Sequence, residues 1–510
     1  MTALGPPPLA DAQVGATPIH LAVGFGVDTT TAPAQEIFAL WRNYLTGRAD
    51  SIRARSYWSP REQAEWTVYD LLSGYVYQGF SNFTVVHLAP AAGLDSTYLI
   101  RTLVSAVDDS THDVRPLALY RVYVTRERGK WVLANPLPRL TRHWKRETIG
   151  SITFVYPPTH AFVRSSAAAT GAFVDSLARA FDLPAPSPIT YYFTDDLLEM
   201  FGALGLDYFP LGSDTVGGRS NTVDRLVFVG SSSAGEVYRH ELAHVILQPL
   251  VGRGNTASLV MEGLMTWTGG SAGLDYEDLL PGLKTYINAH ADLTLKSILT
   301  NPPPRVGTLD VGYDTFATLC HMIYEEGGLA ALGAWLNAGR EPDAVLSAAA
   351  RLLHVPAGRL DAVWRRRLAT LGAPTAQSDS DSTALAKTLA NLIAADARKS
   401  LDHRPPFVVS ADSNPRWSEL LERQLATHPT LLLSPTATAA QRRRAVHISI
   451  GHIQVVGDTA RVTLAWWRCG PSRPGFNFWQ HRVSYELARV REGWRVVRPF
   501  DEVIADGRCL

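Results

Sequence analysis

The residues best suited to chemistry lie in the segment GEVYRHELAHVILQPL, where His240, Glu241 and His244 form an HExxH motif. The apolar periodicity and the absence of Pro and Gly over residues 237–248 predict a helix. Side chains at i and i+4 share one helix face, so both imidazoles can reach one Zn²⁺ at ~2.0 to 2.1 Å. Glu241 then lies beside the open coordination position, as a base for a metal-activated water. The alternative is an amphipathic helix that happens to carry two histidines and a salt-bridging glutamate.

A catalytic zinc needs a third protein ligand, and the position of that ligand separates the classes of HExxH protein. Metzincins have Gly at position 247 and His at 250, but this chain has Leu247 and Leu250, which excludes that class. Glu262 lies in the apolar run LVMEGLMTW, where an unpaired carboxylate has a heavy desolvation cost that a metal would offset. Glu262 is therefore the best third ligand. Asp275 is the competitor, although it lies in a Gly-rich polar loop where an exposed carboxylate needs no partner.

The motif, followed by a Glu-Gly-Leu segment that begins at Glu262, resembles the gluzincin metallopeptidases, especially the bacterial peptidase MA-like domains, over roughly residues 150–340. The resemblance implies an α+β central domain of the gluzincin (thermolysin) type, with a small sheet and a helical half. It implies one Zn²⁺ per chain, bound by His240, His244 and Glu262. It also implies Glu241 as general base and proton shuttle in the cleavage of peptide bonds.

A tetrahedral intermediate needs a hydrogen-bond donor for its developing oxyanion. Gluzincins commonly supply a Tyr from a downstream helix, and the segment LDVGYDTFATLCHMIYEEGG is similar to that helix, with Tyr313 at its first turn. The resemblance thus implies Tyr313 as a catalytic residue, although a half-buried aromatic packed on the motif helix would show the same pattern. Tyr238 and His321 are weaker candidates, and His321 also fits a core histidine.

The two ends of the chain carry similar hairpin sequences, ALYRVYVTRERGKWVLANP and VSYELARVREGWRVVRP. Each has a Tyr, an arginine-rich strand, a turn with Arg-Glu and Gly, and a Trp that opens the return strand. Both resemble the NTF2-like fold, in which helices pack on a curved antiparallel sheet, so the two modules are expected to superpose. The expected organisation is a lead-in at 1–30 with structure starting near Ala34, NTF2-like modules at 31–148 and 376–510, and the zinc domain at 149–375.

In the central segment, strands come first and helices follow, which indicates an α+β domain. The resemblance to the peptidase domains implies that the strand Arg225–Gly230, just before the motif helix, forms one edge of the cleft. Its free backbone groups could then pair with an extended peptide. A normal buried strand is the alternative, and no substrate preference follows from the sequence.

Composition limits the partners and the compartment. The 510 residues include 48 basic and 48 acidic side chains, so no basic field favours a nucleic acid. The apolar runs are shorter than the ~20 residues of a membrane helix, so no transmembrane segment is expected. The start has no basic region followed by an apolar stretch, so no signal peptide is predicted. The compartment is therefore left open: we expect an extracytoplasmic protein if a leader was removed and a cytoplasmic one otherwise.

Three cysteines without a CxxC pair exclude a cysteine-based zinc site. Cys320 fits a buried small apolar residue, whereas Cys469 and Cys509 lie in the last segment and could pair.

The leading hypothesis is a zinc peptidase whose flanking modules gate or present a peptide or protein substrate. The second hypothesis is a binding or assembly protein with a degenerate peptidase domain. Gluzincins often have a carboxylate four residues after the ligand Glu, where it orients a metal ligand. This chain has Thr266 at that position, which implies weaker metal binding or activity. A zinc hydrolase of non-peptide amides or esters would use the same residues. The oligomeric state is left open.

Overall fold

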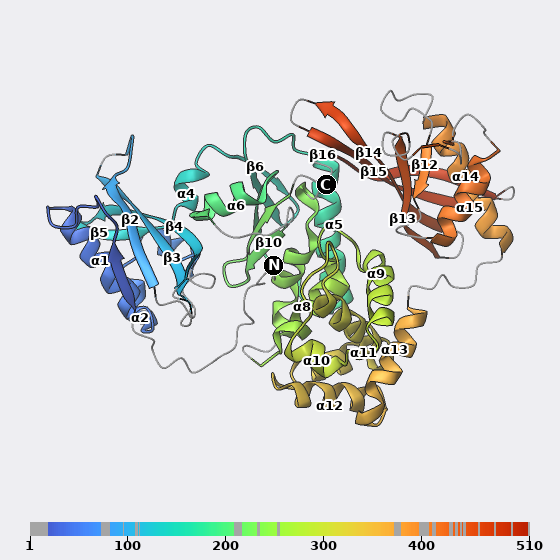
Figure 1. The fold of residues 1–510 in the computed structure, drawn as a ribbon, viewed down its shortest axis with the longest axis horizontal. Helices are drawn as coiled ribbons and strands as arrows, with labels where there is room; N and C mark the ends of the chain where they lie inside the picture. The colour runs from blue at the N-terminus through green and yellow to red at the C-terminus, as the bar shows by residue number, and fades with distance from the viewer. Residues whose placement is uncertain are drawn as a thin grey trace. The chain divides into compact units, whose positions relative to one another are not determined.

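The computed structural model shows a mixed α+β protein with a helical region, and the strands of the described residues form three sheets (Figure 1). The described residues are 19–72, 82–94, 96–107, 111, 113–208, 217–231, 235–251, 255–371, 379–396, 407–410, 415–427, 432–433, 437–438, 441, 445–456, 459–473, 476–490 and 493–507.

The chain divides into two compact units. The expected domain boundaries stay a prediction. Unit 1 consists of Met1–Phe162, Pro184–Ser231 and His244–Gln248, and unit 2 consists of Val163–Leu183, Ser232–Ala243 and Pro249–Leu510.

The first sheet has the order β1-β2-β3-β4-β5, with β1 parallel to β2 and the other neighbours antiparallel. Strand β1 precedes Ala34, so the expectation that structure starts near that residue is wrong. The strand escapes a pattern search because it is four residues long and mostly exposed, without alternating burial. Residues 1–18 of the expected lead-in lie outside the described residues. The elements are β1 (His20–Val23), α1 (Ala34–Gly47), α2 (Ser51–Ser56), η1 (Glu62–Ala64), β2 (Asn82–Pro90), β3 (Thr97–Val107), β4 (Val114–Glu127), β5 (Lys130–Ala134) and α4 (Leu137–Leu140).

A strand from further along the chain completes this sheet. Strand β9 (Leu206–Tyr208) pairs antiparallel with β4. Its Asp207 accepts a hydrogen bond from Arg121 Nε at 2.9 Å and lies 2.8 Å from Arg101 Nε. A second link comes from Asp224, whose carboxylate accepts the backbone N–H groups of Thr67 and Val68 at 2.6 and 2.9 Å. The first sheet therefore depends on residues that lie beyond the expected boundary at 148.

The second sheet has the order β10-β11-β8-β7-β6, with the central three strands parallel and both outer strands antiparallel to their neighbours. Strand β11 is paired on both sides and all five of its residues are buried. The expectation that Arg225–Gly230 forms an edge with free backbone groups is therefore wrong. The Gly-rich strand β10 takes that edge. The elements are β6 (Lys145–Ile149), β7 (Ile152–Tyr156), β8 (Ile189–Thr194), α6 (Leu197–Leu204), β10 (Gly217–Asn221) and β11 (Leu226–Gly230).

The third sheet has the order β12-β13-β14-β15-β16, and its first pair is parallel while the others are antiparallel. This is the strand order and direction of β1 to β5, in agreement with the predicted repeat. The turn residues 491–492 and Cys509 lie outside the described residues, as does the side chain of Cys469. The elements are α14 (Asp379–Asp396), β12 (Phe407–Ser410), α15 (Pro415–Leu425), β13 (Val446–Val456), β14 (Thr459–Arg473), β15 (Phe476–Val490) and β16 (Gly493–Gly507).

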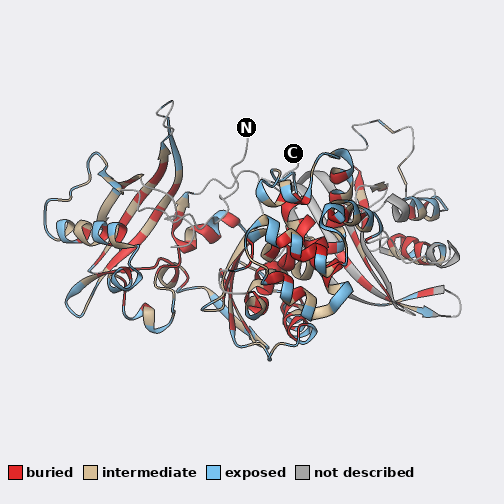
Figure 2. Ribbon diagram, turned by 90° about the horizontal axis from the view of Figure 1, so that it is seen from below, coloured by how far each residue is buried: buried red, intermediate tan, exposed pale blue. Residues whose placement is uncertain are grey.

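Helices make up most of the chain between the second and third sheets, and buried residues concentrate where these helices face one another (Figure 2). Cys320 is buried and free, as expected. Across the described residues, no helix has the length and apolar character needed to cross a membrane. The helices, with α5 from between β7 and β8, are α5 (Arg164–Ala180), η2 (Gly235–Val237), α7 (Arg239–Leu247), η3 (Gln248–Leu250), α8 (Ser258–Gly269), α9 (Tyr276–Ala289), α10 (Leu295–Thr300), α11 (Val311–Leu336), α12 (Pro342–Leu352), η4 (Ala357–Arg359) and α13 (Leu360–Thr370).

Helices α8 and α11 pack backbone to backbone at Gly263. A Cβ added to this residue would lie 2.5 Å from the carbonyl carbon of Phe316, closer than real Cβ atoms come. One turn earlier, a Cβ on Gly312 would lie 3.0 Å from the Leu259 side chain. Glycine therefore permits α8 to cross α11 at close distance, and this packing holds α8, which carries Glu262, in place.

We predict that Gly263→Ala lowers the free energy of unfolding by about 1 to 3 kcal/mol, as in other overpacked cores. Gly333→Ala is the matched control, because Gly333 lies in α11 and a Cβ added there would have nothing within 4 Å. The control should gain stability by up to about 1 kcal/mol through helix propensity. Chemical denaturation followed by circular dichroism measures both. Equal stability of the two variants would contradict close packing at Gly263.

Candidate metal centre

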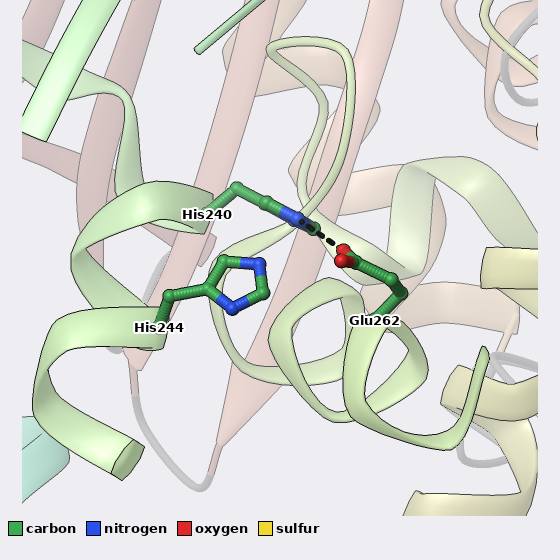
Figure 3. Close-up of side chains that lie close together, drawn as sticks. All are labelled: His240, His244 and Glu262. Carbon is green, nitrogen blue, oxygen red and sulfur yellow. Dashed lines mark hydrogen bonds and ion pairs between the residues drawn. The ribbon is translucent and has the colours of Figure 1, made fainter. Parts of the chain in front are cut away.

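The HExxH motif lies on α7, as the sequence predicts. The helix is continuous from Arg239 to Leu247, so its geometry places His240 and His244 one turn apart. Glu262 comes from the middle of α8 and points toward both imidazoles (Figure 3). One ligand atom from each of the three side chains lies within 4.8 Å of the others. Among the described residues, His240, His244 and Glu262 are thus the group of metal-ligand side chains that lie close enough together to hold one ion.

His240 and Glu262 form a buried contact. The His240 Nε2 lies 3.2 Å from Glu262 Oε2, and the two side chains are 7% and 16% exposed. Burial opposes the charged imidazole, but the hydrogen bond and charge of Glu262, together with the charge of Glu241, raise the pKa of His240 to about 9. The carboxylate in the apolar helix therefore has the polar partner that its desolvation requires.

The other nitrogen of His240 meets a backbone group. His240 Nδ1 lies 2.7 Å from the carbonyl oxygen of Gly270, which follows α8. Thr266, at the position where relatives often have a carboxylate, is fully buried, and its Oγ1 has no hydrogen-bond partner among the described residues. The outer partner of His240 is thus a carbonyl, which the sequence did not indicate.

Neither the rival ligand Asp275 nor the weaker oxyanion-donor candidate His321 belongs to the metal-binding group. Asp275 Oδ1 lies 3.2 Å from Arg239 Nη1, so this carboxylate pairs with an arginine and is outside the metal-binding group. His321 lies between Tyr276 and Glu325, with its Nδ1 3.2 Å from the tyrosine hydroxyl and its Nε2 3.3 Å from the carboxylate. These contacts fit the structural interpretation of His321.

Two tyrosine rings flank His240. The Tyr313 ring is parallel to the imidazole within 3°, with centroids 6.2 Å apart. The Tyr238 ring lies 6.4 Å away and is tilted by 50°. Tyr313 is placed by the start of α11, where Asp310 accepts its backbone N–H at 3.0 Å. Tyr313 therefore lies beside the ligand group, and its catalytic role stays a prediction.

Two acids lie next to Tyr313 at the start of α11, of which Asp314 is buried and Asp310 is partly buried. Asp314 is 2% exposed, and neither of its carboxylate oxygens has a hydrogen-bond partner among the described residues. Burial and the nearby charge of Asp310 raise the pKa of Asp314 well above its usual value, although Arg305 opposes them. Burial likewise raises the pKa of Asp310, helped by the charge of Glu262. The sequence analysis missed this pair, whose spacing of four residues puts both acids on one helix face.

The donor set fits a zinc ion. Two imidazole nitrogens and one carboxylate oxygen are the ligand types of catalytic zinc sites with an open position. The hydrogen bond at Nδ1 of His240 is the outer contact that such ligands usually have. A site of this composition could bind a metal such as zinc.

No family model matches the chain, and no curated protein matches it. Among solved structures, the chain has a partial similarity to an M1 zinc metallopeptidase from Deinococcus radiodurans, with 15% sequence identity and a TM-score of 0.24. The match covers 56% of this chain and 63% of that chain, so it spans less than two thirds of the enzyme.

We predict that Asp314→Asn becomes more stable relative to the natural chain as the pH rises above about 4. The folded protein keeps a proton on Asp314 that the unfolded chain loses near its ordinary pKa of 3.8, so stability falls with rising pH. The relative gain of the asparagine variant reaches up to about 1.4 kcal/mol for each pH unit in that range.

Urea denaturation of both proteins between pH 4 and pH 8, with a chelator present to exclude metal effects, measures this difference. Parallel stability curves for the two proteins would show that Asp314 titrates normally.

Proposed function

We propose that the protein is a zinc-dependent hydrolase that cleaves peptide bonds. The observation that carries the proposal is the convergence of the HExxH histidines with Glu262, which comes from a separate helix 18 residues after the motif (262 − 244). Three ligands leave one coordination position open, which is the arrangement of catalytic rather than structural zinc.

Zinc bound by His240, His244 and Glu262 would polarise a substrate carbonyl and lower the pKa of the attacking water. Glu241 is the general base: it follows His240 on α7 and is 8% exposed. Its carboxylate takes the proton from the water and delivers it to the leaving amine. The Tyr313 hydroxyl donates to the oxyanion that develops on the carbonyl oxygen. Proximity of the Tyr313 and His240 rings supports this role.

We assign the central part of the chain to the gluzincin type and both terminal modules to the NTF2-like type. The parallel central strands followed by helices support the first assignment. The shared strand order of the terminal sheets supports the second. The modules would gate or present a peptide or protein substrate.

The first test compares Glu241→Gln with Glu262→Gln. Both variants replace a carboxylate with an amide, the first at the proposed general base and the second at the proposed metal ligand. Glu241→Gln should keep one zinc per chain and lose hydrolysis by about 10² to 10⁴, because an amide cannot accept the proton. Glu262→Gln should lose both the metal and the activity. Elemental analysis after dialysis and digestion of a fluorogenic peptide library are the measurements. Retained turnover in Glu241→Gln would place the base elsewhere, and a zinc-free natural chain would refute the proposal.

The second test concerns Tyr313. Tyr313→Phe should reduce kcat by about 10² to 10³, because it removes one oxyanion donor and keeps the ring that lies beside His240. Tyr238→Phe is the matched control, since its ring also lies beside His240, and it should retain kcat. Zinc content and melting temperature should be unchanged in both variants. A large loss in the control with near-native Tyr313→Phe would assign the oxyanion donor to Tyr238.

A further inference from the structure

The loop from Gly269 to Asp275, which joins α8 to α9, contacts the start of α7 at three points. The Gly269 backbone lies against Arg239 and His240, the Gly270 carbonyl lies 2.7 Å from His240 Nδ1, and the Asp275 carboxylate pairs with Arg239. The loop therefore touches the first metal-ligand candidate and the residue before it.

Gly269 permits the close approach of the two helix ends. A Cβ at this position would lie 2.8 Å from the Arg239 carbonyl oxygen and 2.9 Å from the His240 Cα. Any larger residue would push the loop away from α7, because backbone atoms cannot yield as a flexible side chain can.

Gly270 is constrained both by its conformation and by its surroundings. Its φ of 76° lies in the left-handed region that favours glycine. A Cβ there would lie 2.0 Å from the Leu274 carbonyl oxygen, which accepts the backbone N–H of Ser271 at 3.0 Å. The Ser271 and Leu274 backbones hydrogen-bond to each other in both directions, which holds the loop closed and keeps the Gly270 carbonyl aimed at His240.

The hydrogen bond selects one form of the imidazole. A carbonyl oxygen can only accept, so Nδ1 of His240 must carry the proton. In this structure Nε2 also faces an acceptor, the Glu262 carboxylate, and donates to it. A metal ligand must be a neutral imidazole with one N–H, so metal binding would remove the Nε2 proton and leave the proton on Nδ1. The ring orientation is fixed by the same contact.

We propose that the 269–275 loop positions His240 for metal binding, with the Gly270 carbonyl holding the imidazole proton on Nδ1 so that Nε2 is the ligand. This rests on the proposed zinc site and assigns to a backbone carbonyl the orienting role that a side-chain carboxylate has in many zinc sites. Gly270 is a positioning residue, since it acts only through His240. The ion pair of Arg239 with Asp275 ties the far end of the loop to the same helix.

The test compares zinc affinity, by competition with a chromophoric chelator, in the natural chain, Gly270→Ala and Gly273→Ala. Gly273 is the matched control because it lies in the same loop and its φ of 78° is also positive, while nothing lies within 4 Å of the added Cβ. Gly270→Ala should bind zinc about 10- to 100-fold more weakly than the control, as for other losses of an outer partner. Circular dichroism checks that both variants are folded.

Equal zinc affinity in folded Gly270→Ala and Gly273→Ala overturns the positioning role and leaves the proposed function intact. A natural chain that binds no zinc overturns the proposed function itself. A crystal structure of the zinc-loaded natural chain gives a second measurement that does not depend on how the variants fold. Zinc on His240 Nε2 with Nδ1 bonded to the Gly270 carbonyl supports the inference, and zinc on Nδ1 overturns it.

Discussion

The Glu262 carboxylate can stay in its apolar surroundings because it contacts His240. Such a group is stable there only with a cation or a hydrogen-bond donor beside it, and the imidazole 3.2 Å away provides one. The contact joins the start of α7 to the middle of α8, so both helices must be held in one arrangement. Packing around the site provides this restraint, because the helix backbones meet without side chains between them at Gly263 and Gly269.

This arrangement also explains why polar groups near the site are buried rather than solvated. The helix that carries Glu262 packs on α11, whose first turns hold Asp310 and Asp314. Close packing excludes water from these carboxyl groups and disfavours their charge. The electrostatic setting of the candidate centre is therefore a result of the helix crossing and not of the ligands alone.

Features with a strong periodic signal could be predicted from the sequence. The 3.6-residue period identifies α7, and the desolvation of a lone carboxylate identifies Glu262 as a partner of the motif. The turn and strand residues of the first terminal hairpin likewise agree with β4 and β5.

The features that the sequence did not reveal depend on remote backbone partners. Strand β10 reads GGRSN, with no apolar alternation, and exists because β11 offers it hydrogen bonds. Its presence is what makes the expected edge at β11 an interior strand. The Gly270 carbonyl has no side-chain signature at all, so its contact with His240 follows only from the three-dimensional arrangement.

The pairing of β9 with β4 has a consequence for how the chain is made. Asp207 and its partner Arg121 are 86 residues apart, so the first sheet still lacks a strand when its own hairpins have left the ribosome. At a synthesis rate of 5 to 20 residues per second, Asp207 is made roughly 4 to 17 seconds after Arg121. During that interval the nascent sheet presents part of β4 as an unpaired edge, which is the kind of surface that molecular chaperones cover.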